Sequence, residues 1–95
     1  MYNDVITLIS VTRTVDAIGD PVEVETRVDV FAASRSVGMR ETYEAMAVGL
    51  KPERVFVLAD YYDYDDQEEI EHEGIRYRVL RTYRKDVELE IVVTR

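Results

Sequence analysis

The sequence predicts a mainly β protein, a small antiparallel β-barrel or sandwich of about six strands with one short α-helix after the second strand. A period-two alternation of apolar and polar residues runs through 22–32. Further short runs rich in β-branched and aromatic residues are separated by Gly, Pro and Asp turns. Only one segment, 38–48, changes to helical spacing. The sum of these patterns is one layered β domain with a single helical insertion.

Length and charge limit the possible functions. The chain has 95 residues, 12 basic and 20 acidic side chains, a net charge of −8 and no cysteine. We expect a single domain over 1–95, without disulfides or thiolate metal ligands. Tight nucleic-acid binding needs a basic face, so we expect at most passage near DNA without adhesion.

The N-terminal part of the chain predicts no membrane partner. The first residues lack the basic start and apolar stretch of a signal peptide. No apolar run approaches the roughly 18 residues of a membrane-spanning helix. We therefore expect a protein that is made and used in a cytoplasm.

The first two strands are separated by a turn at 16–21, which contains Gly and Pro. The first strand, 5–11, has apolar groups on both faces, and we expect both to be covered. The second strand alternates over eleven residues, which predicts one buried and one wet face. The predicted buried face carries Val22, Val24, Thr26, Val28, Val30 and Ala32.

The segment 38–48 predicts a helix of about three turns. Gly49 stands where a helix C-cap would, and Pro52 follows soon after. This segment and its flanks carry more apolar surface than one short helix needs, so the helix packs either on its own barrel or on a neighbour. The candidate subunit or partner interface consists of Met39, Tyr43, Met46, Val48 and Leu50.

Residues 55–59 predict a compact apolar strand, and 70–77 predict a hairpin with a two-residue turn at Glu73-Gly74. This register places Glu71 opposite Arg76 and Glu69 opposite Arg78, which predicts two favourable acid–base pairs.

The last hairpin joins 75–84 to 87–94. Odd-numbered apolar residues define one face of each strand, including Tyr83 on the first, and a two-residue turn at Lys85-Asp86 would separate these faces. We therefore expect an odd-length loop or a bulge between Arg84 and Val87, with Asp86 in the left-handed conformation.

An acidic stretch, LADYYDYDDQEE, occupies 58–69. It does not match a calcium loop of the EF-hand type, because one register places Glu68 where the turn needs Gly and another places tyrosines at ligand positions. Without a metal, the stretch is expected to form an acidic rim or docking loop. The candidate residues of this loop are Asp60, Asp63, Asp65 and Asp66.

No pattern in the sequence predicts catalysis. His72 is the only histidine, and we expect it to be a solvated residue beside a hairpin turn, without the orienting partner of a catalytic base. A zinc site at His72 would need a third ligand and a closed cavity. The glycines stand singly, so there is no phosphate-binding loop. We expect no enzyme activity, no catalytic or metal-binding residue and no cofactor.

Three segments together resemble the head-closure, or head–tail joining, proteins of long-tailed bacteriophages and prophages. They are VDAIGDPVEVETRVDVFA, SVGMRETYEAMAVGLKPERVFVL and IEHEGIRYRVLRTYR. The most specific pieces are Glu41-x-Tyr43-x-Ala45 and Gly74-x-x-Tyr77-x-Val79. The resemblance covers nearly the whole chain, and neither piece is a catalytic signature.

The resemblance implies a structural virion protein with a small β-barrel and a projecting segment. Members of this family self-associate into a ring in the neck of the virion, between the portal and adaptor rings and the tail proteins, on the channel through which the genome leaves. Some act as a stopper for packaged DNA, and assembly takes place in the bacterial host cytoplasm. A ring of roughly twelve copies would carry on the order of −100 charges, which would keep DNA from adhering to it.

Two other functions remain open from the sequence. One is a small monomeric β-barrel module that binds a protein or peptide. The other is a calcium-dependent adhesion-like domain, which rests only on the acidic stretch.

Overall fold

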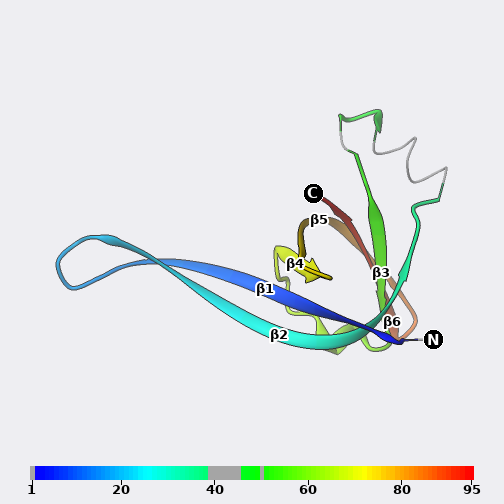
Figure 1. Cartoon of the computed structure of the whole chain (residues 1–95), viewed down its shortest axis with the longest axis horizontal. Helices are drawn as coiled ribbons and strands as arrows, with labels where there is room; N and C mark the ends of the chain where they lie inside the picture. The colour runs from blue at the N-terminus through cyan, green and yellow to red at the C-terminus, as the bar shows by residue number, and fades with distance from the viewer. Residues whose placement is uncertain (1, 39–45, 50) are drawn as a thin grey trace.

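The computed structural model describes residues 2–38, 46–49 and 51–95, and it is mainly β (Figure 1). The strands close into an antiparallel barrel in the order β1-β2-β3-β6-β5-β4, which confirms the predicted class and selects the barrel over the sandwich. The elements are β1 (Asp4–Val15), β2 (Pro21–Arg35), β3 (Arg54–Leu58), a 3₁₀ turn η1 (Tyr61–Asp63), β4 (Glu69–His72), β5 (Ile75–Lys85) and β6 (Glu88–Thr94).

The short helix predicted after the second strand falls mainly on 39–45, outside the described residues. In the part of the chain that the structure does describe, no helical element follows β2 before β3. Gly49, the predicted C-cap, has φ 80°, and its N–H donates a hydrogen bond to the Met46 carbonyl at 3.0 Å. Among the same described residues, no helix is long and apolar enough to cross a membrane.

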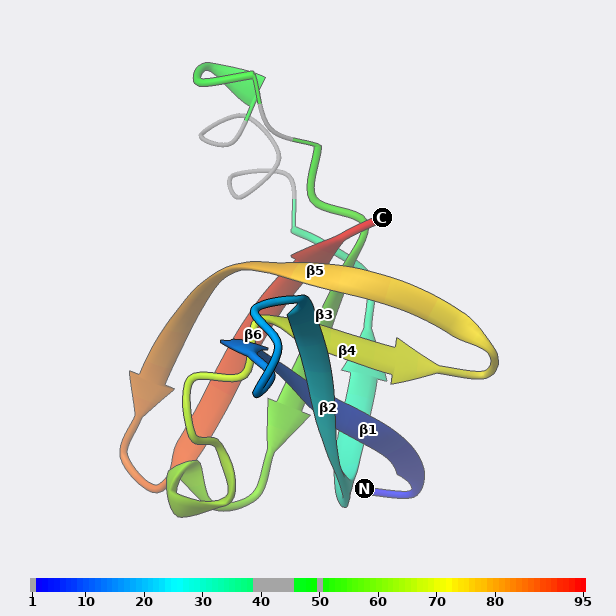
Figure 2. The same ribbon diagram turned by 90° about the vertical axis from the view of Figure 1, so that its left-hand side faces the viewer.

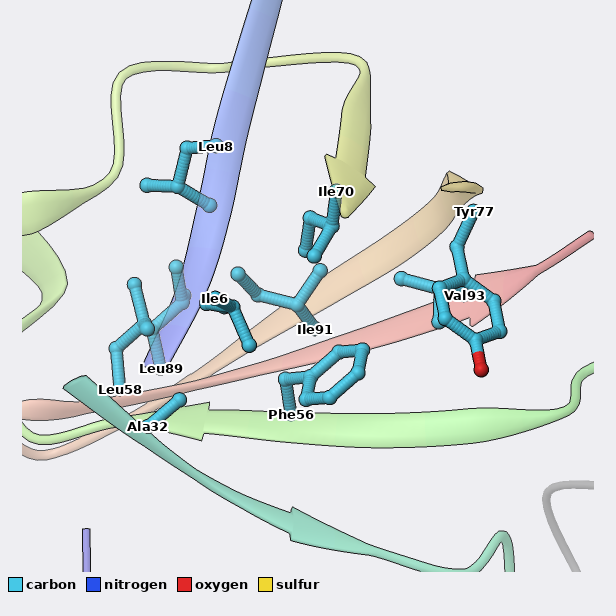
Figure 3. Close-up of a cluster of buried hydrophobic side chains, with 10 residues drawn as sticks. All are labelled: Ile6, Leu8, Ala32, Phe56, Leu58, Ile70, Tyr77, Leu89, Ile91 and Val93. Carbon is cyan, nitrogen blue, oxygen red and sulfur yellow. The ribbon is translucent and has the colours of Figure 1, made fainter. Parts of the chain in front are cut away.

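The barrel interior is filled by one face of each strand (Figure 3). Phe56 lies in this core with its ring edge-on to Tyr77, at a centroid distance of 5.9 Å. β3 is buried on both faces, because Val55 and Val57 point outward and pack against Val92. The compact apolar strand predicted at 55–59 is therefore confirmed. The buried core cluster comprises Ile6, Leu8, Ala32, Phe56, Leu58, Ile70, Tyr77, Leu89, Ile91 and Val93.

The β4–β5 hairpin has the predicted register, with His72 opposite Ile75 and Glu71 opposite Arg76. Glu73 and Gly74 have φ values of 51° and 77°, the two positive angles of a type I′ turn. The ion pairs differ from the prediction, because Arg76 reaches diagonally to Glu69 rather than straight across to Glu71.

The prediction that His72 is solvated is wrong. Its side chain is 6% exposed and lies edge-on to Phe56, with ring centroids 5.1 Å apart. The cause is strand alternation: His72 follows Ile70 on the inner face of β4, so the barrel covers it although the turn begins at the next residue.

The β5–β6 hairpin contains the predicted irregularity at a different place. Lys85 pairs with Glu88, which leaves a two-residue turn at 86–87, and Asp86 has the expected left-handed φ of 58°. The register shift lies between Val79 and Arg81, so Leu80 is the extra residue. Residues after this bulge change face, and Tyr83 is exposed instead of sharing the core face with Tyr77.

The first hairpin is longer than the barrel that it enters (Figure 1). β1 pairs with β4 only through Thr7–Ile9, and β2 pairs with β3 only from Ala32 onward. We call residues 10–26, which project beyond these contacts, the arm. The radius of gyration is 14.8 Å, against about 12.4 Å for a compact domain of this length.

Candidate functional site

The arm is a two-stranded ribbon without a third strand on either side. Six consecutive pairs join it, from Ser10 with Thr26 to Val15 with Pro21. Its tip is a structured turn, in which the Asp16 carboxylate accepts hydrogen bonds from the N–H groups of Ile18 and Asp20 at 3.0 and 2.8 Å. A Gly at position 19 supplies the left-handed φ of 90° that this turn needs. The turn predicted at 16–21 is confirmed.

One face of the arm presents valines of β2 beside the hydroxyl side chains of Ser10, Thr12, Thr14 and Thr26. Val22 and Val24 lie on this face of the arm, and Val28 continues it at the base of the arm; we call these three residues the valine face. Val24 is 50% exposed and Val28 is 44% exposed, and Thr26 between them is also exposed. The prediction that this face is buried is therefore wrong for these three residues. The same face of β2 becomes buried at Ala32, where β3 begins to pair with it. The valine face lacks a covering layer within the described residues.

The opposite face of the arm is charged and tied to the barrel at its base. The Arg76 guanidinium on β5 binds the Glu25 carboxylate at 2.7 Å and also pairs with Glu69 on β4. Arg27 pairs with Glu71 at 3.1 Å and with Glu25 at 3.5 Å. We call these five residues the base network. It links β2 to β4 and β5 across the intervening β1.

The base network shifts the titration of its members. The hydrogen bond from Arg76, followed by the positive charges of Arg76 and Arg27, holds the pKa of Glu25 below its usual range. The hydrogen bonds that Arg27 and Arg76 donate to carboxylates raise the pKa of both guanidinium groups. Both shifts favour the charged forms, so the base network is intact at neutral pH.

The base network also covers an apolar residue. Ile9 alternates with Leu8 and so faces the outside of the barrel, yet it is fully buried. Its ladder neighbours on that face are Arg27 on one side and Glu69 on the other. The aliphatic stems of these two side chains flank Ile9, while the Arg27 guanidinium pairs with Glu71 and the Glu69 carboxylate pairs with Arg76.

A second apolar pair lies on the outer face of the barrel half of the β1–β2 hairpin, near the start of β1. Val5 and Phe31 face each other across β1 and β2, and both are exposed, Phe31 at 67%. They lie on the opposite side of the sheet from the valine face, because they alternate with Ile6 and Ala32. The molecule therefore presents two apolar surfaces that differ in position and direction.

The acidic loop over 60–66 is held by hydrogen bonds within the loop and to Gln67, and its carboxylates face solvent. Asp60 caps the 3₁₀ turn by accepting from the Tyr62 N–H at 3.0 Å. Gln67 is buried, and its side-chain oxygen accepts from the Asp65 N–H at 2.7 Å. The carboxylates of Asp63, Asp65 and Asp66 lie on exposed residues. The sequence did not indicate that Gln67 holds this loop, because it is one polar residue in a segment of acidic residues.

The loop is docked against the β5–β6 turn (Figure 2). The Tyr61 N–H donates to the Val87 carbonyl at 2.8 Å, and the Arg84 guanidinium lies 3.6 Å from the centre of the Tyr61 ring. The acidic surface is thus held in a fixed position next to one end of β6 and β5. A fixed charged edge can repel phosphate or dock a basic neighbour.

The candidate interface around the predicted helix is described only in part. Met46 and Val48 are exposed. Met39, Tyr43 and Leu50 lie outside the described residues. The side chains of the two described members are therefore largely open to solvent.

Three potential metal ligands from the described residues meet at the end of the barrel where β1 begins. They are Asp4, His72 and Glu73, whose ligand atoms all lie within 4.8 Å of one another. The sequence offered no signal for Asp4, because it is separated from His72 by most of the chain.

Comparison with protein-family models and with curated protein sequences finds no match to this chain.

Proposed function

We propose that this chain is a structural protein of the phage head–tail connector, which joins the DNA-filled capsid to the tail as one copy in a ring. The resemblance in sequence suggests the class, and the barrel with a projecting arm supports it. The observation that carries the proposal is the exposed valine face on the arm. An isolated two-stranded ribbon is marginally stable in water, so an arm of this kind gains from a neighbour that covers it.

Ring formation needs two different surfaces on each copy, one for each neighbour. The valine face and the Val5–Phe31 pair are two such surfaces, and they point to opposite sides of the same hairpin. A contact between the arm of one copy and the Val5–Phe31 surface of the next would bury apolar groups on both sides. Because the two surfaces differ, such a contact is repeated from copy to copy and closes when the rotation fits the ring.

Charge supports the same function. The net charge of −8 and the ordered acidic loop make repulsion between copies strong at low salt. Repulsion of this kind opposes premature rings and favours assembly on a partner that supplies basic groups. In an assembled ring the same charge would repel the phosphates of passing DNA.

The test is the oligomeric state with and without a partner ring. Light scattering coupled to size exclusion should show rings when portal or adaptor protein is present. Val24→Lys combined with Val28→Lys should abolish ring formation while leaving the barrel folded, as measured by circular dichroism. Glu23→Gln, on the opposite face of the same strand, is the matched control and should leave assembly intact.

The rival function, a monomeric module for a protein or peptide, makes the opposite prediction. The wild-type chain would then stay monomeric beside every connector partner, and that result would overturn the connector proposal.

A further inference from the structure

The shortest ladder of the barrel joins β1 to β4 through three pairs, Thr7–Glu71, Leu8–Ile70 and Ile9–Glu69. Continuing this register places His72 beside Ile6, with Asp4 as its diagonal neighbour on the same inner face. Asp4 begins β1, His72 ends β4, and Glu73 starts the turn to β5. Three ionisable side chains from both strands therefore meet where their hydrogen bonding stops.

His72 is held in a fixed orientation at this end of the barrel. Its side chain is buried, and Phe56 packs against the ring at an interplanar angle of 62°. Its Nε2 atom lies 3.7 Å from Asp4 Oδ1. This separation is longer than a hydrogen bond. The nitrogen and the carboxylate oxygen thus face each other across a gap.

The gap matches the spacing of ligands around a small cation. Zn²⁺ binds nitrogen and oxygen ligands at about 2.0–2.2 Å in tetrahedral geometry, which places neighbouring ligand atoms about 3.3–3.6 Å apart. The Asp4–His72 pair needs only a small adjustment to reach this spacing. Glu73, whose ligand atom lies within 4.8 Å of the others, is exposed and long enough to close the remaining distance.

We propose that Asp4, His72 and Glu73 form a site for one Zn²⁺ ion or a similar divalent first-row transition metal. One imidazole nitrogen and two carboxylates suit these metals, whereas Mg²⁺ and Ca²⁺ prefer oxygen ligands alone. Three protein ligands leave a fourth position for water. The two carboxylates balance the charge of the ion, and the buried ring supplies one ligand that is already oriented.

Metal binding would cross-link two strands and stabilise the folded chain. The metal would connect the first residue of β1 to the end of β4 and the following turn, next to the shortest ladder. An ion that binds only the folded chain stabilises it in proportion to the logarithm of its concentration above the dissociation constant. The proposal is independent of ring formation, since all three ligands belong to one copy.

Calorimetric titration of the tag-free full-length chain with zinc chloride tests the site. We expect saturation at one ion per chain and a thermal midpoint that rises with zinc and not with magnesium. Asp4→Asn and Glu73→Gln each remove one ligand while preserving shape, and each should weaken binding by about tenfold or more. Cobalt(II) in place of zinc should give the intense visible bands of tetrahedral coordination.

Two further variants separate ligation from folding. His72→Phe keeps an aromatic contact for Phe56 and should abolish binding; should it fail to fold, Asp4→Asn carries the same test at a residue that is partly exposed. Asp65→Asn in the acidic loop is the control and should bind zinc as the wild type does. The proposal is overturned by the absence of saturable binding, or by binding that Asp4→Asn and Glu73→Gln leave unchanged.

Discussion

The β1–β2 hairpin contains two halves that share one alternating pattern and differ in what covers them. In the barrel half, Ile6 and Leu8 are fully buried, because β4 and the core lie against them. In the arm half, Val24 of β2 lies on the same face of the hairpin and is half exposed. Alternation therefore identifies an apolar face, while the neighbours in space decide whether that face is interior or a surface for another molecule.

The largest difference in stability is expected between substitutions of the two phenylalanines, of which Phe56 is buried and Phe31 is exposed. Phe56→Ala in the barrel core should lower the free energy of unfolding by about 3–5 kcal/mol, because it leaves a cavity among buried side chains. Phe31→Ala makes the same chemical change on the exposed outer face and should cost within about 0.5 kcal/mol. Urea denaturation of both variants measures the difference. Equal losses would show that Phe31 is covered in the monomer.

A smaller difference in stability is expected between substitutions at the two turn glycines, one in the barrel and one at the tip of the arm. Gly74 closes the β4–β5 hairpin with φ 77°, and Gly19 closes the arm with φ 90°. Alanine at a left-handed position costs about 1–2 kcal/mol. We expect this full loss in Gly74→Ala.

In Gly19→Ala the loss of global stability should be less than half of that, because the arm tip can open while the barrel stays folded. Chemical denaturation gives the global values, and hydrogen exchange of the arm amides should show the local opening. A Gly19→Ala variant as destabilised as Gly74→Ala would mean that the arm and barrel unfold as one unit.

The base network predicts how the arm is joined to the barrel as a function of pH. The pKa of Glu25 lies below its ordinary value of 4.5. Its contribution to stability is therefore present above that value and is lost as the pH falls through the lower, folded-state pKa. Glu25→Gln should reduce the thermal midpoint slightly at pH 7, and the two proteins should converge in acid.

Glu23→Gln is the control for this experiment. Glu23 pairs with Arg13 at 3.0 Å, and both residues lie within the arm, exposed to solvent. Its removal should leave the midpoint unchanged at every pH. Added salt should also narrow the difference between wild type and Glu25→Gln, since the base network is exposed. A difference that persists in acid would assign Glu25 a role other than ion pairing.

The sequence was sufficient for strand order along the chain, for the β4–β5 register and for the left-handed Asp86, because each depends on local turn chemistry or pairing. It misplaced the bulge, which lies at Leu80 rather than beside the turn. One extra residue at any point in β5 brings the apolar residues of β5 and β6 onto a common face near the turn. The sequence pattern therefore shows that one extra residue is needed, but it does not show where in the strand that residue lies.

The candidate sites also differ in whether local sequence was enough to identify them. The acidic loop was identifiable from composition, whereas the meeting of Asp4 with His72 depends on barrel closure, which no local pattern encodes. The burial of His72 was missed for a related reason. Its neighbours Glu71 and Glu73 are polar, and only the alternation from Ile70 would have placed its side chain inside.

The acidic loop should show the smallest effect on folding and a clear effect on assembly. Replacing Asp60, Asp63, Asp65 and Asp66 by Asn removes four charges, yet Asn at position 60 can still accept the hydrogen bond from Tyr62. The buried Gln67 and the Tyr61 contacts do not depend on these charges. We expect the free energy of unfolding to change within about 0.5 kcal/mol.

Light scattering with a connector partner should then show altered assembly, because the four substitutions lower the net charge of each copy from −8 to −4 and so weaken the repulsion between copies. Asp60→Ala separates charge from capping, since it loses the hydrogen bond as well and should cost about 0.5–1 kcal/mol. Should the fourfold Asn variant unfold while Asp60→Asn alone does not, the remaining aspartates hold the loop through contacts beyond charge. The acidic loop would then contribute to the folding of the barrel and would not serve only as a charged surface for assembly.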